Sequence, residues 1–269
     1  MDYLNYGKQV QQQSQKPQPQ GFGQQNVQLT QDDFSFGNLN QQTLQYKPEP
    51  QAAPQTKDDL IQLFPVPLLI CPCPFDSGME LEWIKKQSMR KSASSDEAIL
   101  TGTQRLNRQS EDTFILDKPE MSRVRQFIEV KVKEYVVNVM GSDSETVITQ
   151  SWLNKSGKGE SHHEHVHPNS MISGVWYPQI HEKLPPIQFR TGRQRDVTFS
   201  IKKFNLFNSA TFMLPMKKGE LILFPSHLSH SVPPNKSDEE RISLSFNTWP
   251  KGNLGEKAQL TYLPFDRLM

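Results

Sequence analysis

Histidines are concentrated in one part of this sequence. All seven lie between residues 162 and 230, and four of them fall within residues 162–167. Side chains on a strand point alternately to its two faces, so a strand here would place the odd-numbered histidines together. That face would hold His163, His165 and His167, and the other would hold His162, Glu164 and Val166. Two imidazoles at positions i and i+2 can converge on one ion, which predicts half of a mononuclear metal site.

A second histidine group follows a predicted strand further along the chain. Residues 220–224 (ELILF) are apolar apart from the first, and Pro225 ends them. His227 and His230 come directly after this strand, where their side chains would emerge at its end. His230 therefore supplies the third imidazole that a mononuclear site needs.

An arginine stands at the start of the next apolar segment, residues 241–247. Arg241, Ser243 and Ser245 share one face of that predicted strand. An inward arginine is costly unless it meets an anion, and its planar fork suits a carboxylate. Histidines with such an arginine suit an iron that binds an anionic keto acid, whose far carboxylate the arginine holds.

Two helices are predicted before the histidines. Residues 77–80 (SGME) have the spacing of a capping box and open a short helix. A longer helix is bracketed by Pro119 at its start and Gly141 just past its end. Its predicted buried face comprises Val124, Ile128, Val132, Tyr135 and Val139. Residues 59–70 predict a buried extended segment, and the polar residues 88–113 predict a long surface excursion.

Short β segments follow Gly141, each bounded by Gly, Pro, Asn or Ser. The predicted strands are 146–153, 161–167, 172–177, 186–190, 197–201, 210–214, 220–224 and 241–247. Many short strands in one stretch predict a mainly β domain, a sandwich or jelly roll, with the helices packed on one sheet.

The N-terminal region differs in composition from the rest of the chain. Residues 1–56 contain 16 glutamines, whereas the remaining 213 residues contain 10. This region has no apolar periodicity, which predicts a disordered Gln/Pro-rich arm at 1–56 and a domain at 57–269. The arm is either a tolerated flexible segment or a docking tail for a partner, with Phe34, Phe36 and Leu39 as its anchor.

Composition restricts the partners and the compartment. The net charge of +1 gives no general case for binding nucleic acid or an anionic membrane. Apolar runs fall far short of the ~18 residues that a membrane-spanning helix needs. No secretory signal is visible at the N-terminus, and Cys71 and Cys73 are expected to be reduced thiols. We therefore expect a cytoplasmic protein.

Three blocks of sequence resemble a family of 2-oxoglutarate/Fe(II)-dependent oxygenases with members in bacteria and in tailed phages. The blocks are His165 to Tyr177, Leu223 to His230, and Arg241 to Asn247. The resemblance covers about residues 60–250, outside the Gln-rich arm. It implies a double-stranded β-helix (jelly roll, cupin-like) core, Fe(II) as the metal and 2-oxoglutarate as co-substrate, and it names no substrate.

The resemblance also implies which residues form the site. Its blocks make His165, His167 and His230 the metal ligands, although the common set in this superfamily has a carboxylate in place of His167. The pair His162 and Glu164 would restore that carboxylate. It is less favoured, because the family block is anchored on His165 and strand alternation separates Glu164 from it. A mixed ligand set stays open. The predicted 2-oxoglutarate residues are Arg241, Ser243, Tyr177 and Asn154, the last two being equally compatible with ordinary buried polar groups.

The predicted function is that of a hydroxylase that releases succinate and CO2 and acts on an unidentified substrate. It would work in the host cytoplasm if a phage encodes it. One alternative is a three-His cupin-like metal enzyme that does not use 2-oxoglutarate. The other is a non-catalytic β-sandwich, an assembly or virion accessory protein tethered by the arm. Metal content distinguishes the last from the enzymes, and succinate production distinguishes the two enzymes.

Overall fold

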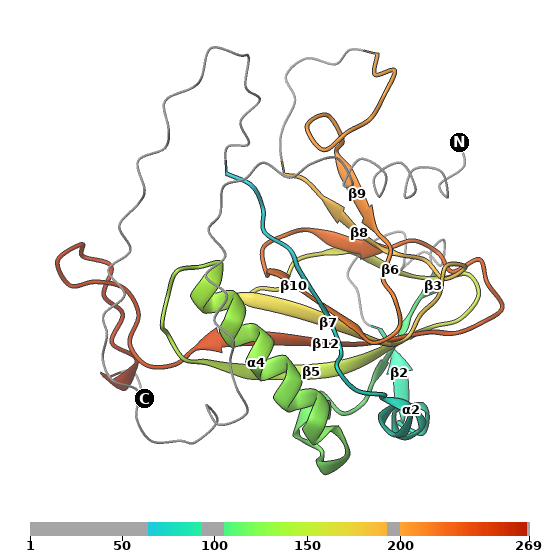
Figure 1. The fold of residues 1–269 in the computed structure, drawn as a ribbon, viewed down its shortest axis with the longest axis horizontal. Coiled ribbons are helices and arrows are strands. Elements are labelled where there is room, and N and C mark those ends of the chain that lie inside the picture. The colour runs from blue at the N-terminus through green and yellow to red at the C-terminus, as the bar shows by residue number, and fades with distance from the viewer. Residues whose placement is uncertain (1–63, 93–104, 193–199, 268–269) are drawn as a thin grey trace. The chain divides into compact units, whose positions relative to one another are not determined.

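The computed structural model describes residues 64–92, 105–192 and 200–267 (Figure 1). The predicted arm at 1–56 and the domain boundary at 57 lie outside these residues, as does most of the predicted strand 197–201. The chain divides into two units, and the fold below is that of the second, Val66–Met269.

Eight strands in the second half of the chain form a jelly roll. They are β5 (Thr146–Ser156), β6 (Glu160–His165), β7 (Ile172–Gln179), β8 (Ile187–Arg190), β9 (Thr211–Leu214), β10 (Glu220–Pro225), β11 (His230–Val232) and β12 (Arg241–Pro250). Strands β5, β7, β10 and β12 belong to one sheet, and β6, β8, β9 and β11 to the other. This interleaving of the chain between two sheets is the jelly-roll topology that the sequence predicts.

Short strands from earlier in the chain extend both sheets. They are β1 (Leu69–Pro72), β2 (Met89–Lys91), β3 (Arg105–Leu106) and β4 (Arg108–Ser110). Among the described residues, one sheet has the order β1-β10-β7-β12-β5-β4-β2 and the other β3-β6-β11-β8-β9. The prediction of a surface excursion at 88–113 is therefore wrong for its described part, since β4 pairs with β5.

The prediction of a buried segment at 59–70 is also wrong for its described part, residues 64–70. Only its end joins a strand, β1, which pairs with β10 at the edge of the larger sheet. Val66 is 48% exposed and Ile70 is 43% exposed. Val66 precedes β1, and Ile70 lies on a strand at the edge of the sheet, which has a neighbour on one side only.

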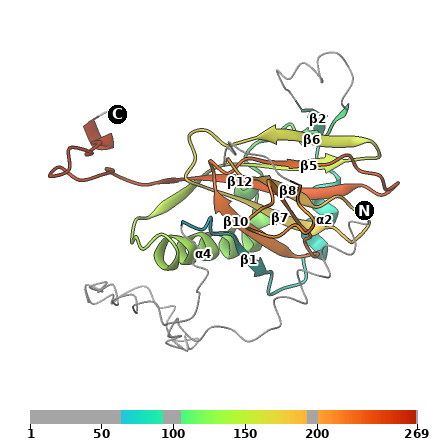
Figure 2. The same cartoon turned by 90° about the horizontal axis from the view of Figure 1, so that it is seen from above.

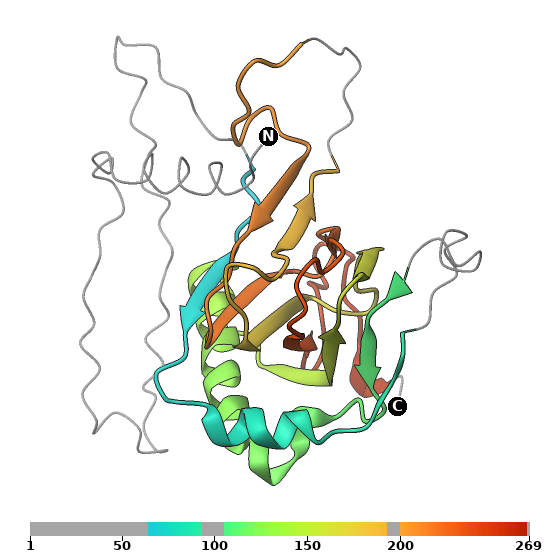
Figure 3. The same ribbon diagram turned by 90° about the vertical axis from the view of Figure 1, so that its right-hand side faces the viewer.

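Helices α2 (Gly78–Lys85) and α4 (Ser122–Asn138) pack on the outer face of the larger sheet. Figures 1 and 2 show α4 lying across that sheet, and Figure 3 shows both helices outside the strands. Three short 3-10 helices complete the described elements: η2 (Ile115–Asp117), η3 (Pro119–Met121) and η4 (Phe265–Arg267). None of the helices described is long and apolar enough to cross a membrane.

The helical predictions hold except at the helix ends. Val139 is 41% exposed because α4 has ended before it, and Val136 is buried in the core instead. The capping box is wrong, since Ser77 makes no side-chain cap bond. Glu80 is 2% exposed and pairs with Arg123 of α4, an interaction between distant parts of the chain.

Strand β10 shows how one apolar run serves two cores. Leu221 and Leu223 pack with α2 and α4, whereas Ile222 and Phe224 face the space between the two sheets. A strand buried on both faces has a continuous apolar sequence, as ELILF does. In the inner core the rings of Phe224 and Phe189 pack against each other, and Phe224 also contacts the ring of His230.

Gly174 in β7 should not tolerate a side chain. A Cβ there would overlap the ring of Phe246 on β12 and lie 2.8 Å from Cδ2 of Leu223 on β10. We expect Gly174→Ala to lower the free energy of unfolding by about 1–3 kcal/mol, as overpacked cores do. Urea denaturation measures this. Gly192→Ala, with no atom within 4 Å of its Cβ, is the control and should stay within about 0.5 kcal/mol of the parent. Equal stabilities of the two variants would contradict the tight β7 packing.

Candidate functional site

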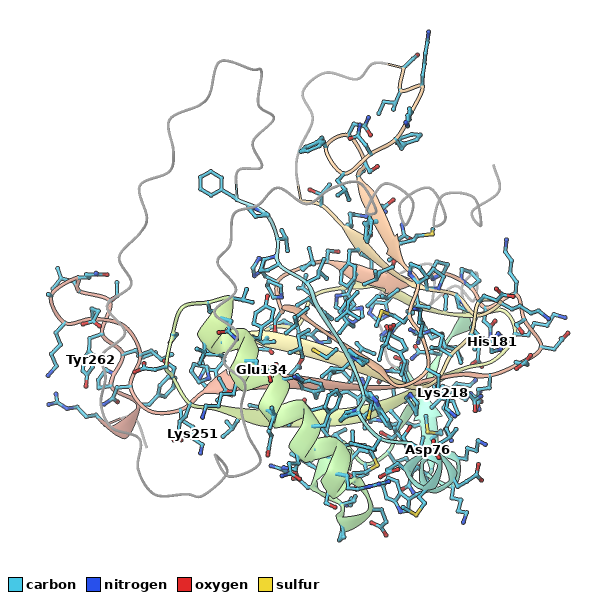
Figure 4. The ribbon with its side chains drawn as sticks, viewed as in Figure 1. Asp76, Glu134, His181, Lys218, Lys251 and Tyr262 are labelled. Atoms are coloured by element: carbon cyan, nitrogen blue, oxygen red, sulfur yellow. The ribbon has the colours of Figure 1, made fainter. Side chains whose placement is uncertain are left out.

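A pocket between the two sheets brings together the predicted site residues. Strands β5, β6, β7, β11 and β12 all contribute to its lining. It collects His165, His167, His230, Arg241, Ser243, Tyr177 and Asn154. The pocket lining does not include the other three histidines of the chain, which are His163, His181 and His227. His181, labelled in Figure 4, lies at the periphery, where its Nε2 is 2.9 Å from a carboxylate oxygen of Glu239.

Three imidazoles meet at one end of this pocket. His165 and His230 are direct partners on the adjacent antiparallel strands β6 and β11. One ring nitrogen from each of His165, His167 and His230 lies within 4.8 Å of the other two. The Nε2 atoms of His167 and His230 are only 3.2 Å apart. The sheet register therefore fixes two of the three histidines, and the chain just after β6 supplies the third.

The predicted strand 161–167 ends early, at His165. His167 precedes Pro168, and a residue before proline is restricted while the proline itself has no N–H for a ladder. The main-chain N–H of His167 donates instead to the carbonyl oxygen of Ser226, at 2.9 Å. This bond ties the segment after β6 to the turn that leads from β10 to His230.

Hydrogen bonds set the tautomers of two of these rings. Nδ1 of His165 lies 2.8 Å from the carbonyl oxygen of His163, and Nδ1 of His230 lies 2.9 Å from that of Leu228. A carbonyl oxygen can only accept, so both Nδ1 atoms carry the proton and both Nε2 atoms keep a free lone pair. Metal-binding histidines are usually oriented in this way by a partner on their other nitrogen.

The three histidines are neutral near neutral pH. Burial, and then the neighbouring His165, lowers the pKa of His167 and of His230 to about 3. Burial also lowers the pKa of His165. Neutral imidazoles whose lone pairs face a common point repel one another unless a cation lies between them. This set of nitrogen donors suits a divalent transition metal such as Fe(II).

Strand β6 contains a bulge that overturns the predicted alternation of its histidines. Val232 pairs with His162 and His230 pairs with His165, so β6 uses one residue more than β11 over the same length. The extra residue turns His162 to the same side as His165, where it lines the pocket. The two rings stack, with their centroids 4.4 Å apart.

Glu164 is not brought into the pocket. Its carboxylate is exposed, accepts a 2.7 Å bond from Nε of Arg190 and another of 2.7 Å from the hydroxyl of Ser229. The alternative ligand pair of His162 and Glu164 is therefore split, with the carboxylate held on the outer surface of the smaller sheet.

Arg241 lies buried at the other end of the pocket. It is 3% exposed, and it donates from Nε to the carbonyl oxygen of Pro185 and from Nη1 to the hydroxyl of Ser243, both at 3.1 Å. None of the ion pairs between described residues includes it. Burial lowers its pKa, but a guanidinium stays charged in proteins. A buried charge without a counter-ion is costly, so this site is suited to an anionic ligand.

Tyr177 and Asn154 lie beside this arginine. The Arg241 guanidinium is 5.2 Å from the centroid of the Tyr177 ring, and its charge acts on the buried tyrosine hydroxyl, which has no partner at full hydrogen-bond geometry among the described residues. The amide of Asn154 is held at both ends: it donates to Ser245 at 3.0 Å and accepts from Asn107 at 2.9 Å. The tyrosine hydroxyl is thus free to bind a ligand, whereas the asparagine has one N–H left.

A chain of buried hydroxyl groups supports the metal end and was missed in the sequence. The hydroxyls of Ser173 and Ser226 are 2.8 Å apart, and Ser226 donates to Ser170 at 2.7 Å. Ser173 also donates to Oδ1 of Asn247, at 2.8 Å. Through Ser226 this network reaches the main chain of His167. Small polar residues inside apolar strands were the available signal.

One known family is similar to the segment that contains the pocket. Residues 150–247 match the family described as "Putative 2OG-Fe(II) oxygenase". The match runs from β5 to β12 and includes all three clustered histidines and Arg241. This part of the chain is similar to the 2OG-Fe(II) oxygenase family. The description of that family names 2-oxoglutarate and Fe(II). No curated protein matches the sequence.

Several solved structures are similar to this chain at low identity. A 2OG-Fe(II) oxygenase family protein from Burkholderia pseudomallei is 12% identical, covers 67% of this chain and 84% of its own, and has a TM-score of 0.49. HygX from Streptomyces hygroscopicus, solved with nickel, 2-oxoglutarate and hygromycin B, is 13% identical over 69% and 84%, with a TM-score of 0.48. A Pseudomonas putida prolyl-4-hydroxylase is 12% identical over 69% and 93%, with a TM-score of 0.47.

Proposed function

We propose that this oxygenase holds Fe(II) through His165, His167 and His230, binds 2-oxoglutarate with Arg241 and Ser243, and hydroxylates an unidentified substrate. The observation that carries the proposal is one pocket with converging imidazole nitrogens at one end and a buried arginine without a counter-ion at the other. When bound, the two cofactors supply the oxidative chemistry: O2 converts 2-oxoglutarate to succinate and CO2 and adds one oxygen atom to a substrate C–H bond.

The charges of the pocket favour an anionic co-substrate. No aspartate or glutamate lines it, and its histidines are neutral, so Arg241 is its one charged side chain among the described lining residues. A divalent metal would raise the local charge further. A dicarboxylate neutralises much of that charge and satisfies the buried guanidinium and the free hydroxyl of Tyr177.

A second candidate is the three-His metal enzyme without 2-oxoglutarate. The all-histidine ligand set favours it, because the common set in oxygenases of this kind contains a carboxylate. This alternative gives no role to Arg241, which is buried in the same pocket. The non-catalytic sandwich leaves both the histidine cluster and the arginine without a role.

Anaerobic titration with 2-oxoglutarate tests the proposed function. The purified protein is loaded with Fe(II) and the weak visible metal-to-ligand charge-transfer band is followed. We expect the band to appear and saturate, and succinate to form once O2 is admitted. A protein that binds Fe(II) but gives no band at saturating 2-oxoglutarate would contradict the proposal and favour the second candidate.

The compartment and partners are proposed on sequence features. We place the protein in the cytoplasm, or in the host cytoplasm if a phage encodes it, and the free thiols of Cys71 and Cys73 support a reducing compartment. The near-zero net charge supports a substrate other than nucleic acid and no membrane partner. A docking partner for residues 1–56 stays a prediction.

A further inference from the structure

His162 is a pocket residue that the proposed function does not use. Its ring lines the pocket, but the metal cluster comprises the other three histidines and not this one. Its ring nitrogens have no hydrogen bond among the described residues; the ring stacks on that of His165 and meets that of His163 edge-on, with centroids 5.4 Å apart. Stacking fixes the plane of the ring while leaving its N–H available to a ligand.

The position of His162 lies on the Arg241 side of the metal cluster. Along β6, His162 is three residues closer than His165 to the turn that joins β6 to β5. At about 3.3 Å per residue, this places its main chain roughly 10 Å nearer that turn, while its ring extends back to stack on that of His165. Arg241 begins β12 opposite Ser156, the last residue of β5 before the same turn. His162 therefore lies along the pocket between the metal end and the arginine end.

The bulge in β6 lies between His162 and His165, and it turns the side chain of His162 toward the pocket. Without the extra residue, Val232 would pair with His163, and His162 would face away from the pocket. Bulges are found next to active sites, where they redirect a side chain. The unpartnered ring, its position and the bulge are separate observations, and each points to a ligand role.

We propose that His162 binds the distal carboxylate of 2-oxoglutarate together with Arg241, through a ring N–H, and so selects a dicarboxylate keto acid. This inference rests on the proposed function. Arg241 already donates to two protein groups, and a donor from β6 in the same pocket would add a further bond to a two-oxygen anion. His162 is thus a residue for co-substrate binding and not a metal ligand.

Two matched variants of the full-length protein test this role by calorimetry under anaerobic conditions. His162→Phe keeps an aromatic ring against His165 and removes the donor, whereas His162→Asn keeps an N–H donor. Each protein is titrated first with Fe(II), and then with 2-oxoglutarate or with 2-oxovalerate, which lacks the distal carboxylate. We expect His162→Phe to bind 2-oxoglutarate about ten-fold more weakly, as the loss of a charge-assisted bond predicts. Its Fe(II) and 2-oxovalerate affinities should match the parent, and Asn should recover part of the loss.

Three results would overturn the inference, and they are distinguishable. Unchanged 2-oxoglutarate affinity in His162→Phe would remove the role of His162 alone. A loss of Fe(II) affinity as large as that of His165→Ala would make His162 a metal ligand. Absence of 2-oxoglutarate binding by the parent would remove both this inference and the proposed function. If the Phe variant does not fold, His162→Ala also removes the donor, and parental Fe(II) and 2-oxovalerate affinities in that variant would show that the pocket is intact.

Discussion

Replacing His230 with alanine should abolish Fe(II) binding at micromolar metal and leave the jelly roll folded. The change removes one of the three clustered imidazoles, whose Nε2 is 3.2 Å from that of His167. The main chain of β11 still pairs with β6 and β8, so the sheet stays intact. The ring also contacts Phe224, and we expect a modest fall in melting temperature from that lost packing. Anaerobic Fe(II) titration and circular dichroism measure the two effects.

His227→Ala is the matched control for this variant. His227 is exposed and lies three residues before His230 on the same turn, outside the pocket. It should bind Fe(II) as the parent does. If His230→Ala also binds Fe(II) with parental affinity, the metal ligands are other residues and the assignment of the cluster is wrong.

The faces of the regular strands could be predicted from sequence, because alternation is a local property. In β12, Ile242 and Leu244 pack in the core under the helices, whereas Arg241 and Ser243 line the pocket. The strand has no irregularity over these residues in its pairing with β5. Sequence order and the period of two were sufficient to place this half of the site.

The faces of β6 could not be predicted in the same way. Its bulge is defined by the register with β11, a strand more than sixty residues away in the sequence. A single extra residue reverses the face of every side chain beyond it, which is why His162 was assigned to the wrong side. The pairing of Glu80 with Arg123 is another tertiary interaction that local capping rules do not contain.

The hydroxyl network could not be predicted from sequence for the same reason. Nothing in the local sequence distinguishes the three serines of this network, Ser170, Ser173 and Ser226. They come together only because strands β7 and β10 pair side by side. Once paired, each buried hydroxyl needs a partner, and the three satisfy one another. The network makes the position of His167 dependent on β7 and β10 together, which no single segment could reveal.

Replacing Arg241 should weaken 2-oxoglutarate binding and leave Fe(II) binding almost unchanged. Arg241→Lys keeps the charge but loses the planar fork that holds a carboxylate through two bonds. We expect a loss of affinity of about ten-fold or more, at about 1.4 kcal/mol per decade. Arg241→Ala should lose more, because the carboxylate then has no cationic partner. The anaerobic titration measures both constants, and retained Fe(II) affinity shows that the pocket is still folded.

Arg190→Lys is the control with the same chemical change outside the pocket. Arg190 is exposed and pairs with Glu164 on the outer surface, so its replacement should leave 2-oxoglutarate affinity unchanged. If Arg241→Ala binds 2-oxoglutarate as tightly as the parent, another group holds the distal carboxylate. The comparison also distinguishes the candidate functions. A three-His enzyme that uses no keto acid has no 2-oxoglutarate affinity to lose, whereas the proposed oxygenase should lose more of it in Arg241→Ala than in Arg241→Lys.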